Sequence, residues 1–165
     1  MAVNAYLSFF DSADGESIVK GREKWVEIQG WDWEIEAESS WTKGGGASVG
    51  KPSPGAMRWV HHFDLASPKI MGYMCTGKAF PKVQLDVLRP SSTGVTTPFF
   101  AALMEGAYIT KVSTSGSEEG NVLQVVEMVF ESIKVDYTTQ SPKGGAGVKA
   151  TFNWDIPAGT ASPSA

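Results

Sequence analysis

Acidic and apolar residues alternate in one short stretch of this sequence, from Trp31 to Glu38. The acids are Asp32, Glu34, Glu36 and Glu38, and the residues between them are Trp31, Trp33, Ile35 and Ala37. Carboxylates at positions i and i+2 of a strand lie roughly 7 Å apart, a separation that glycosidases use. Glycosidase acids, however, have contrasting environments that separate their pKa values, and a straight strand cannot wrap around a calcium ion. Four similar acids in a row therefore favour a solvated sheet face over catalysis.

Two histidines and one cysteine are the other candidates for chemistry. His61 and His62 are adjacent, so in a strand they point to opposite faces and cannot chelate one metal ion. Cys75 has no second cysteine with which to form a disulfide or a thiolate metal site. The sequence also lacks a Gly-x-Ser-x-Gly nucleophile motif. We expect structural histidines, and we predict no catalytic residue, no metal site and no cofactor.

Nucleotide and nucleic-acid binding are both disfavoured. Four residues separate Gly45 from Gly50-Lys51, which matches the first part of a phosphate-binding loop. The next residue should be Ser or Thr to hold magnesium, but it is Pro52, which also disfavours the helix that must follow. The net charge is −4, and no cluster of Lys and Arg is present to neutralise phosphates.

The dominant repeat along the chain is two residues, the period of a strand. In the clearest case, Phe152 and Trp154 share one face while Asn153 and Asp155 share the other. Such alternation, with Gly, Pro and Ser between the strands, predicts a mainly β fold, an antiparallel barrel or sandwich. The apolar positions change phase near Ser132, which predicts a bulge or a barrel corner there.

One short α-helix is predicted at about residues 67–76. Ser67 is a good N-cap, Pro68 suits the first helical position, and Gly77 can adopt the left-handed stop. Apolar residues spaced i, i+3 and i+4 from Ile70 give this helix one buried face. We expect it to plug an open end of the barrel.

Two segments are predicted to lie outside regular structure. Residues 39–55 are rich in Gly, Ser, Lys and Pro and are predicted to form a long loop, which in a compact domain is usually functional. Residues 157–165 are small and polar and are predicted to be a disordered tail. Residues 1–156 then form a single domain, which is long enough to bury a core.

The residue patterns alone leave the function open. The N-terminus has no basic segment followed by an apolar run, so no Sec signal peptide is predicted. No stretch approaches the roughly 20 apolar residues of a membrane helix, so no membrane insertion is expected. A monomeric carbohydrate-binding β-sandwich or a glycosidase remains one alternative, since tryptophans can stack on sugars and paired acids can hydrolyse them.

Several short motifs occur in a recognisable order between residues 1 and 156. They are MAVNAYLSF with DGES, QGWDWEIE, GKPSPG, DLASPKIM with CTGKAFPKVQLDV, YITKVSTSGS and VVEMVFESIKVDY. In this order they resemble the Hcp family, the haemolysin-coregulated proteins that form the tube of the type VI secretion system. The resemblance implies a β-barrel with one helix, which assembles as a homohexamer into rings that stack into a tube.

The resemblance also implies partners and a place of action. A contractile sheath and a spike would be the partners in the machine, and small effector proteins would travel in the lumen of the ring. The protein would be made in the bacterial cytoplasm and exported without a Sec signal. Its function would be mechanical, with no catalysis.

The resemblance implies roles for two sets of residues. The segment at residues 39–55 would contribute contacts between subunits and rings, through Gly44, Gly45, Gly46, Lys51, Pro52 and Pro54. The tryptophan-bearing strand would line the inner wall, with Trp31 and Trp33 packed toward the barrel core. Asp32, Glu34 and Glu36 would then face the lumen.

Overall fold

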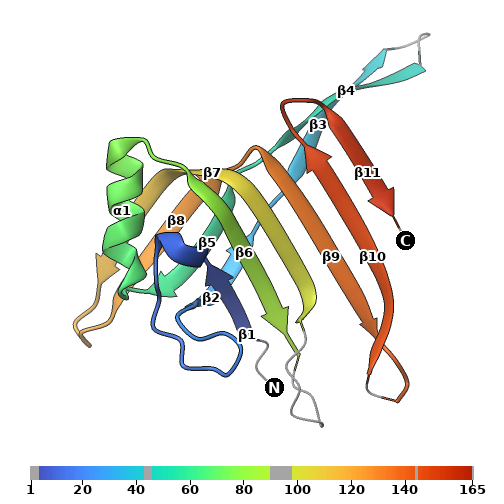
Figure 1. The fold of residues 1–165 in the computed structure, drawn as a ribbon. Coiled ribbons are helices and arrows are strands. Elements are labelled where there is room, and N and C mark those ends of the chain that lie inside the picture. Colours follow the sequence, from blue (N-terminus) through green and yellow to red (C-terminus); the bar gives the residue numbers. More distant parts are fainter. Residues whose placement is uncertain (1–3, 43–45, 90–97, 144, 165) are drawn as a thin grey trace.

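Six antiparallel strands close into a barrel in the computed structural model of the protein, which describes residues 4–42, 46–89, 98–143 and 145–164. The order around the barrel is β7, β6, β1, β2, β5 and β8, and β8 pairs back to β7. The strands are β1 (Asn4–Ser8), β2 (Val26–Asp32), β5 (Met57–His62), β6 (Phe80–Leu88), β7 (Pro98–Gly116) and β8 (Val122–Val129). The predicted mainly β fold, an antiparallel barrel with one short α-helix, is therefore confirmed (Figure 1).

The longest strand, β7, belongs both to the barrel and to a sheet that extends from it. Its first half pairs with β9 (Ser132–Gln140), whereas its second half pairs with β8. Gly106 lies between the two halves with a φ of +62°, a backbone conformation that glycine adopts without steric cost. β10 (Ala146–Asp155) and β11 (Thr160–Ser164) continue the sheet beyond β9.

The C-terminal segment, predicted to be disordered, forms β11 over residues 160–164. Its residues pair in register with β10, for example Thr160 with Asp155 and Ala161 with Trp154. Without β11, β10 would present an unpaired row of backbone donors and acceptors. Backbone groups of any sequence can form these hydrogen bonds, so the small and polar composition did not indicate a strand. The prediction of disorder is wrong for residues 160–164.

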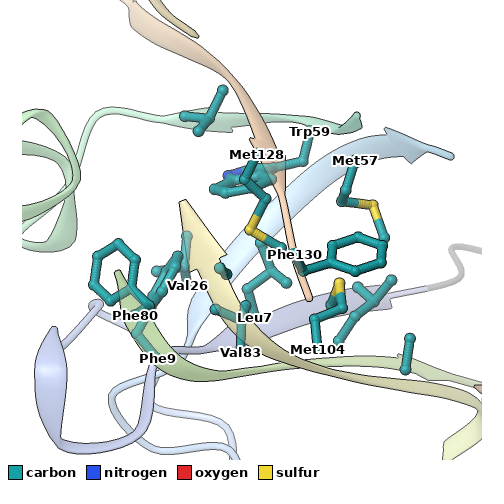
Figure 2. Close-up of a cluster of buried hydrophobic side chains, with 14 of the residues drawn as sticks. Leu7, Phe9, Val26, Met57, Trp59, Phe80, Val83, Met104, Met128 and Phe130 are labelled. Carbon is teal, nitrogen blue, oxygen red and sulfur yellow. The ribbon is translucent and has the colours of Figure 1, made fainter. Parts of the chain in front are cut away.

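Apolar side chains from every barrel strand fill the interior. Figure 2 shows Leu7, Phe9, Val26, Met57, Trp59, Phe80, Val83, Met104, Met128 and Phe130 gathered in this core. Full burial of a large apolar side chain contributes about 1.5–3 kcal/mol each. Trp31 and Trp33 pack against the same core and Trp154 is buried in it, so the predicted inward direction of these tryptophans is confirmed.

The single α-helix among the described residues, α1 (Ala66–Thr76), packs against β7 and covers the core on that side (Figure 1). Ile70 is fully buried, and the ring of Tyr73 stacks on Phe80 with their centroids 4.0 Å apart. Gly77 ends the helix in the left-handed region with a φ of +67°, and its N–H donates to the carbonyl oxygen of Met74. The predicted stop is confirmed.

The start of α1 differs from the prediction. The helix begins at Ala66, one residue early, and Ser67 is not its N-cap. The carboxylate of Asp64 accepts the N–H of Ala66 at 2.9 Å and so satisfies a free donor of the first turn. The hydroxyl of Ser67 instead accepts the N–H of Asp64 at 2.9 Å.

The change of phase near Ser132 is a corner between two strands. β8 ends at Val129 and β9 begins at Ser132, which leaves Phe130 and Glu131 outside both. Glu131 donates its N–H to Glu105 of β7 and accepts the N–H of Ile156 after β10, both at 3.0 Å. The corner is thereby tied to two strands of the extended sheet.

The segment predicted as a long loop is mostly paired. β3 (Ile35–Thr42) and β4 (Gly46–Pro54) form a separate two-stranded antiparallel sheet, here called the arm. Figure 1 shows the arm leaving the barrel. Gly, Pro and Ser favour turns, which is why composition predicted a loop. Pairing between two neighbouring strands depends on their backbones, and it overrides that preference here.

Candidate interaction surface

The arm has one apolar and one polar face. Residues directly opposite one another in an antiparallel pair share a face. The apolar face carries the pairs Ile35 with Pro54 and Ala37 with Pro52, followed by Ser39 with Val49. The polar face carries Glu36 with Ser53 and Ser40 with Ser48, whose hydroxyls hydrogen-bond to each other.

The apolar face of the arm is open to solvent in the single chain. Ile35 is 46% exposed and Val49 is 73% exposed. Ala37 and Pro52 are exposed as well, and Pro54 is half-buried. An isolated two-stranded hairpin is at best marginally stable in water, and a contiguous exposed apolar face marks an interaction site. The arm therefore has the properties of a surface that a partner covers.

The three acids predicted to face a lumen lie where β2 leads into β3 of the arm. Asp32 ends β2, Glu34 lies between β2 and β3, and Glu36 is on the polar face of the arm. All three side chains are exposed. Asp32 also forms an ion pair with Arg58 of β5 at 3.7 Å, and an exposed pair of this kind contributes less than about 1 kcal/mol.

The residues predicted to make contacts between subunits fall on the arm where they are described. Gly46 is the first residue of β4, and Lys51, Pro52 and Pro54 follow along the same strand. Gly44 and Gly45 lie outside the described residues. Pairing shifts by one residue between Pro52 and Val49, which inserts a bulge at Gly50 and Lys51.

A buried network of side chains links β5 to α1. The indole N–H of Trp59 donates to Nδ1 of His61 at 2.9 Å, and Nε2 of His61 is 3.1 Å from the hydroxyl of Ser67. The Ser67 hydroxyl in turn donates to the carboxylate of Asp64 at 3.3 Å. Burial lowers the pKa of His61 to about 4 and raises that of Asp64.

The direction of these hydrogen bonds decides what the network can do. Because Trp59 donates to Nδ1, the proton of the neutral His61 ring is on Nε2, which donates to Ser67. The histidine therefore cannot take the Ser67 proton as a general base would. His62 points the other way and contacts Gln29 on the surface. His61 therefore has the structural role that was predicted for it, and it fastens the helix to the barrel.

Comparison with known proteins places the chain in a family. The family model described as "Type VI secretion system effector, Hcp" matches residues 6–137, which is well over half of the chain. The chain belongs to the Hcp family. Hcp is a tube protein of the type VI secretion system, and its family is structural. No protein with curated annotation matches the chain in sequence.

Solved structures share the fold over nearly the whole chain. A type six secretion system protein is 23% identical, with a TM-score of 0.89 and coverage of 98% of this chain and 100% of that one. Hcp1 from Salmonella typhimurium is 27% identical, with a TM-score of 0.77 and the same coverage of both chains. A type VI secretion system effector from Yersinia pestis is 21% identical, with a TM-score of 0.72 and coverage of 92% and 99%.

Two further properties concern the part of the chain that the structure describes. It contains no helix long and apolar enough to cross a membrane. It also contains no group of three or more His, Cys, Asp or Glu side chains placed to hold a metal ion.

Two features of the site carried no recognisable sequence signal. The first is the pairing of β3 with β4 into the arm, and the second is the joint at its base, where Trp33 contacts Gly55. A glycine that directly follows Pro54 was the one hint of a close approach at that point.

Proposed function

We propose that this Hcp chain is the subunit of a homohexameric ring, that the rings stack into a tube, and that the tube carries small effector proteins. Family membership supports the tube role, because Hcp is a tube protein. A ring needs head-to-tail contacts that close, and a tube needs end-to-end contacts that remain open to another copy. Sheath and spike proteins would be its partners in the machine, and that machine would export it from the bacterial cytoplasm.

The observation that carries this proposal is the exposed apolar face of the arm. Its most exposed apolar residue, Val49, is 73% exposed and does not pack against the core of its own chain. A contact with a second copy would remove this face from water and stabilise a hairpin that is marginal alone. Lys51, Pro52 and Pro54 would lie in the same contact.

A matched pair of neighbouring substitutions tests the arm. Val49→Asp places a charge on the apolar face, whereas Ser48→Asp places the same charge on the polar face, and both positions are exposed in the single chain. We expect Val49→Asp to raise the concentration for half-assembly by roughly tenfold or more, since a buried unpaired charge opposes association. Ser48→Asp should leave assembly within about a factor of three of wild type.

Size-exclusion chromatography with light scattering measures this outcome. Wild type should have six times the chain mass of 17.7 kDa, with six-fold rings in negative stain. A wild-type monomer at micromolar concentration would contradict the ring and favour the carbohydrate-binding alternative. Equal effects of the two substitutions would remove the apolar face from the contact.

We also propose that Asp32, Glu34 and Glu36 face the lumen of the ring. Repeated in six subunits, these carboxylates would give the channel a negative wall that attracts basic cargo. The double variant Asp32→Lys with Glu34→Lys should leave the ring intact and weaken retention of a small basic protein such as lysozyme roughly tenfold or more. Native mass spectrometry reports both properties, and a ring that dissociates instead would place these acids at a subunit interface.

A further inference from the structure

At the base of the arm, the paired strands β2 and β5 are separated from the paired strands β3 and β4 by a short irregular segment on each side, here called the joint. β2 leads into β3 and β4 leads into β5, yet Trp33 and Glu34 on one side and Gly55 and Ala56 on the other belong to no strand. β2 and β5 are held by their neighbours in the barrel, whereas β3 and β4 pair only with each other. The direction of the arm therefore depends on what fixes these four residues.

Trp33 connects the two sides of the joint. Its indole N–H donates to the carbonyl oxygen of Gly55 at 3.0 Å, across the joint. Beside it, the N–H of Gly55 donates to the carbonyl oxygen of Glu34 at 2.8 Å. These bonds replace the strand pairing that is interrupted here.

The ring of Trp33 also reaches the body of the protein. Its centroid lies 5.6 Å from that of Phe130, at the corner between β8 and β9, and 6.5 Å from that of Trp154 on β10. Aromatic pairs at such separations stabilise the fold beyond the apolar area that they bury. One side chain thus holds the joint, the corner and the extended sheet together.

Gly55 allows the two sides of the joint to approach. A Cβ atom at this position would lie 2.9 Å from Cγ of Glu34 and 3.2 Å from its carbonyl oxygen. A side chain at residue 55 would therefore force both the Glu34 side chain and the backbone at this crossing to shift.

We propose that Trp33 is the positioning residue of the arm. Its contacts with Gly55, Phe130 and Trp154, here called the lock, fix the joint at the base of the arm. The lock thereby sets the direction in which the arm meets a second copy of the chain. This second half of the proposal rests on the proposed function. β3 has eight residues, so at ~3.3 Å per residue the arm reaches about 26 Å, and a swing of about 10° at the joint would move its tip by about 4–5 Å. An interface that tolerates about 1 Å of backbone movement could not absorb that displacement.

The direction of the arm can be measured within one chain. Cys75 on α1 is the only cysteine and is exposed, so spin labels on Cys75 and on a Ser48→Cys arm, at the exposed polar face, report the distance between arm and body by pulsed electron paramagnetic resonance. Labelled chains are diluted with unlabelled Cys75→Ser chains to suppress distances between copies. Trp33→Phe keeps an aromatic ring but removes the N–H that holds Gly55.

We expect a single narrow distance distribution with Trp33 present and a distribution at least about twice as wide for Trp33→Phe, because one hydrogen bond of the lock is lost. Gly55→Ala, which keeps the indole but crowds the backbone crossing at Glu34, should broaden the distribution in the same direction. Trp31→Phe is the matched control: Trp31 stacks on Phe100 within the barrel and should leave the distribution unchanged. A distribution that stays narrow in both joint variants would overturn the lock.

Ring formation by the same Trp33 variants, without spin labels or the added cysteine, separates the two halves of the proposal. Trp33→Phe should raise the concentration for half-assembly roughly tenfold while circular dichroism shows an unchanged fold. A broadened distribution with unchanged assembly would overturn the link from joint to contact and leave the proposed ring standing. A wild-type chain that forms no ring would refute the proposed function and, with it, that link, while the distance result would still decide the lock.

Discussion

Replacement of Asp86 by alanine is expected to lower the free energy of unfolding by about 3–5 kcal/mol, since it leaves a buried guanidinium without its partner. The carboxylate of Asp86 on β6 is 2.8 Å from Nη2 of Arg22, and these side chains are only 8% and 13% exposed. Gln84 also donates to Asp86 at 2.8 Å and would lose this bond, which leaves its Nε2 only the longer contact of 3.4 Å with the carbonyl oxygen of Leu85. Urea unfolding at a fixed protein concentration measures the loss.

Arg22 has this effect because it holds a long segment without strands against the barrel. Its guanidinium lies over the ring of Trp25 at 5.1 Å and donates to the carbonyl oxygen of Gly21. Within the same segment the N–H of Gly15 donates to Lys24 at 2.7 Å. Loss of Asp86 therefore leaves the buried Arg22 charge without its anion and removes a contact that holds this segment on the barrel.

A nearby ion pair provides the matched control. Lys24 and Asp14 are 3.7 Å apart, but their side chains are 74% and 55% exposed. Lys24→Ala should therefore cost less than about 1 kcal/mol. The double replacement Arg22→Met with Asp86→Leu should recover most of the lost stability, because apolar side chains can replace a buried pair. An Asp86→Ala variant as stable as Lys24→Ala would contradict the buried pair.

The sequence predicted the barrel because local alternation is enough to define a strand with one buried face. Trp154 is buried where its phase in residues 148–156 places it, and the stop at Gly77 follows from one residue type. By phase Val148 lies on the same face of β10 as Trp154, yet its side chain is 71% exposed, and the pairing of β10 with β9 shifts register between Ala146 and Lys149, on either side of it. Periodicity predicts which face of a strand is apolar, but it does not predict how far along the strand other residues pack on that face.

The site was less predictable because its main contacts join residues that are distant in the sequence. The alternating acids indicated a solvated face, but nothing in residues 31–38 showed where the arm leaves the barrel. The hydrogen bond from Trp33 to Gly55 and the ion pair from Arg22 to Asp86 form only once the strands are in register. A single sequence carries no local signal for contacts of this kind.

The free energy of unfolding is also expected to fall by about 3 kcal/mol, from the titration of His61 alone, as the pH is lowered from about 6.5 toward 4. Burial lowers the pKa of this histidine from 6.5 to about 4, with a smaller contribution from His62, while Gln124 works in the opposite direction. Between these two values the unfolded chain binds a proton that the folded chain does not, so stability rises with pH in this window and is lost as the pH falls. A shift of one pKa unit corresponds to about 1.4 kcal/mol.

The geometry explains why the folded protein resists protonation. Nδ1 of His61 accepts the indole N–H of Trp59, so a proton added there would face another donor. Nε2 already carries the ring proton toward Ser67. Asp64 opposes the effect, because burial raises its pKa, with a smaller contribution from Glu16, and it therefore binds a proton more readily in the folded chain than in the unfolded one.

Adjacent histidines make this prediction testable with a close control. Free energies of unfolding are measured by urea at several pH values between 7 and 4 for wild type, His61→Gln and His62→Gln. His61→Gln should lose most of the slope between pH 6.5 and 4, because glutamine does not titrate, whereas His62→Gln should keep it, because His62 is on the exposed face of β5. Equal slopes in all three proteins would show that the His61 ring is protonated in the folded state as readily as in the unfolded chain, and would contradict a network in which Trp59 donates to it.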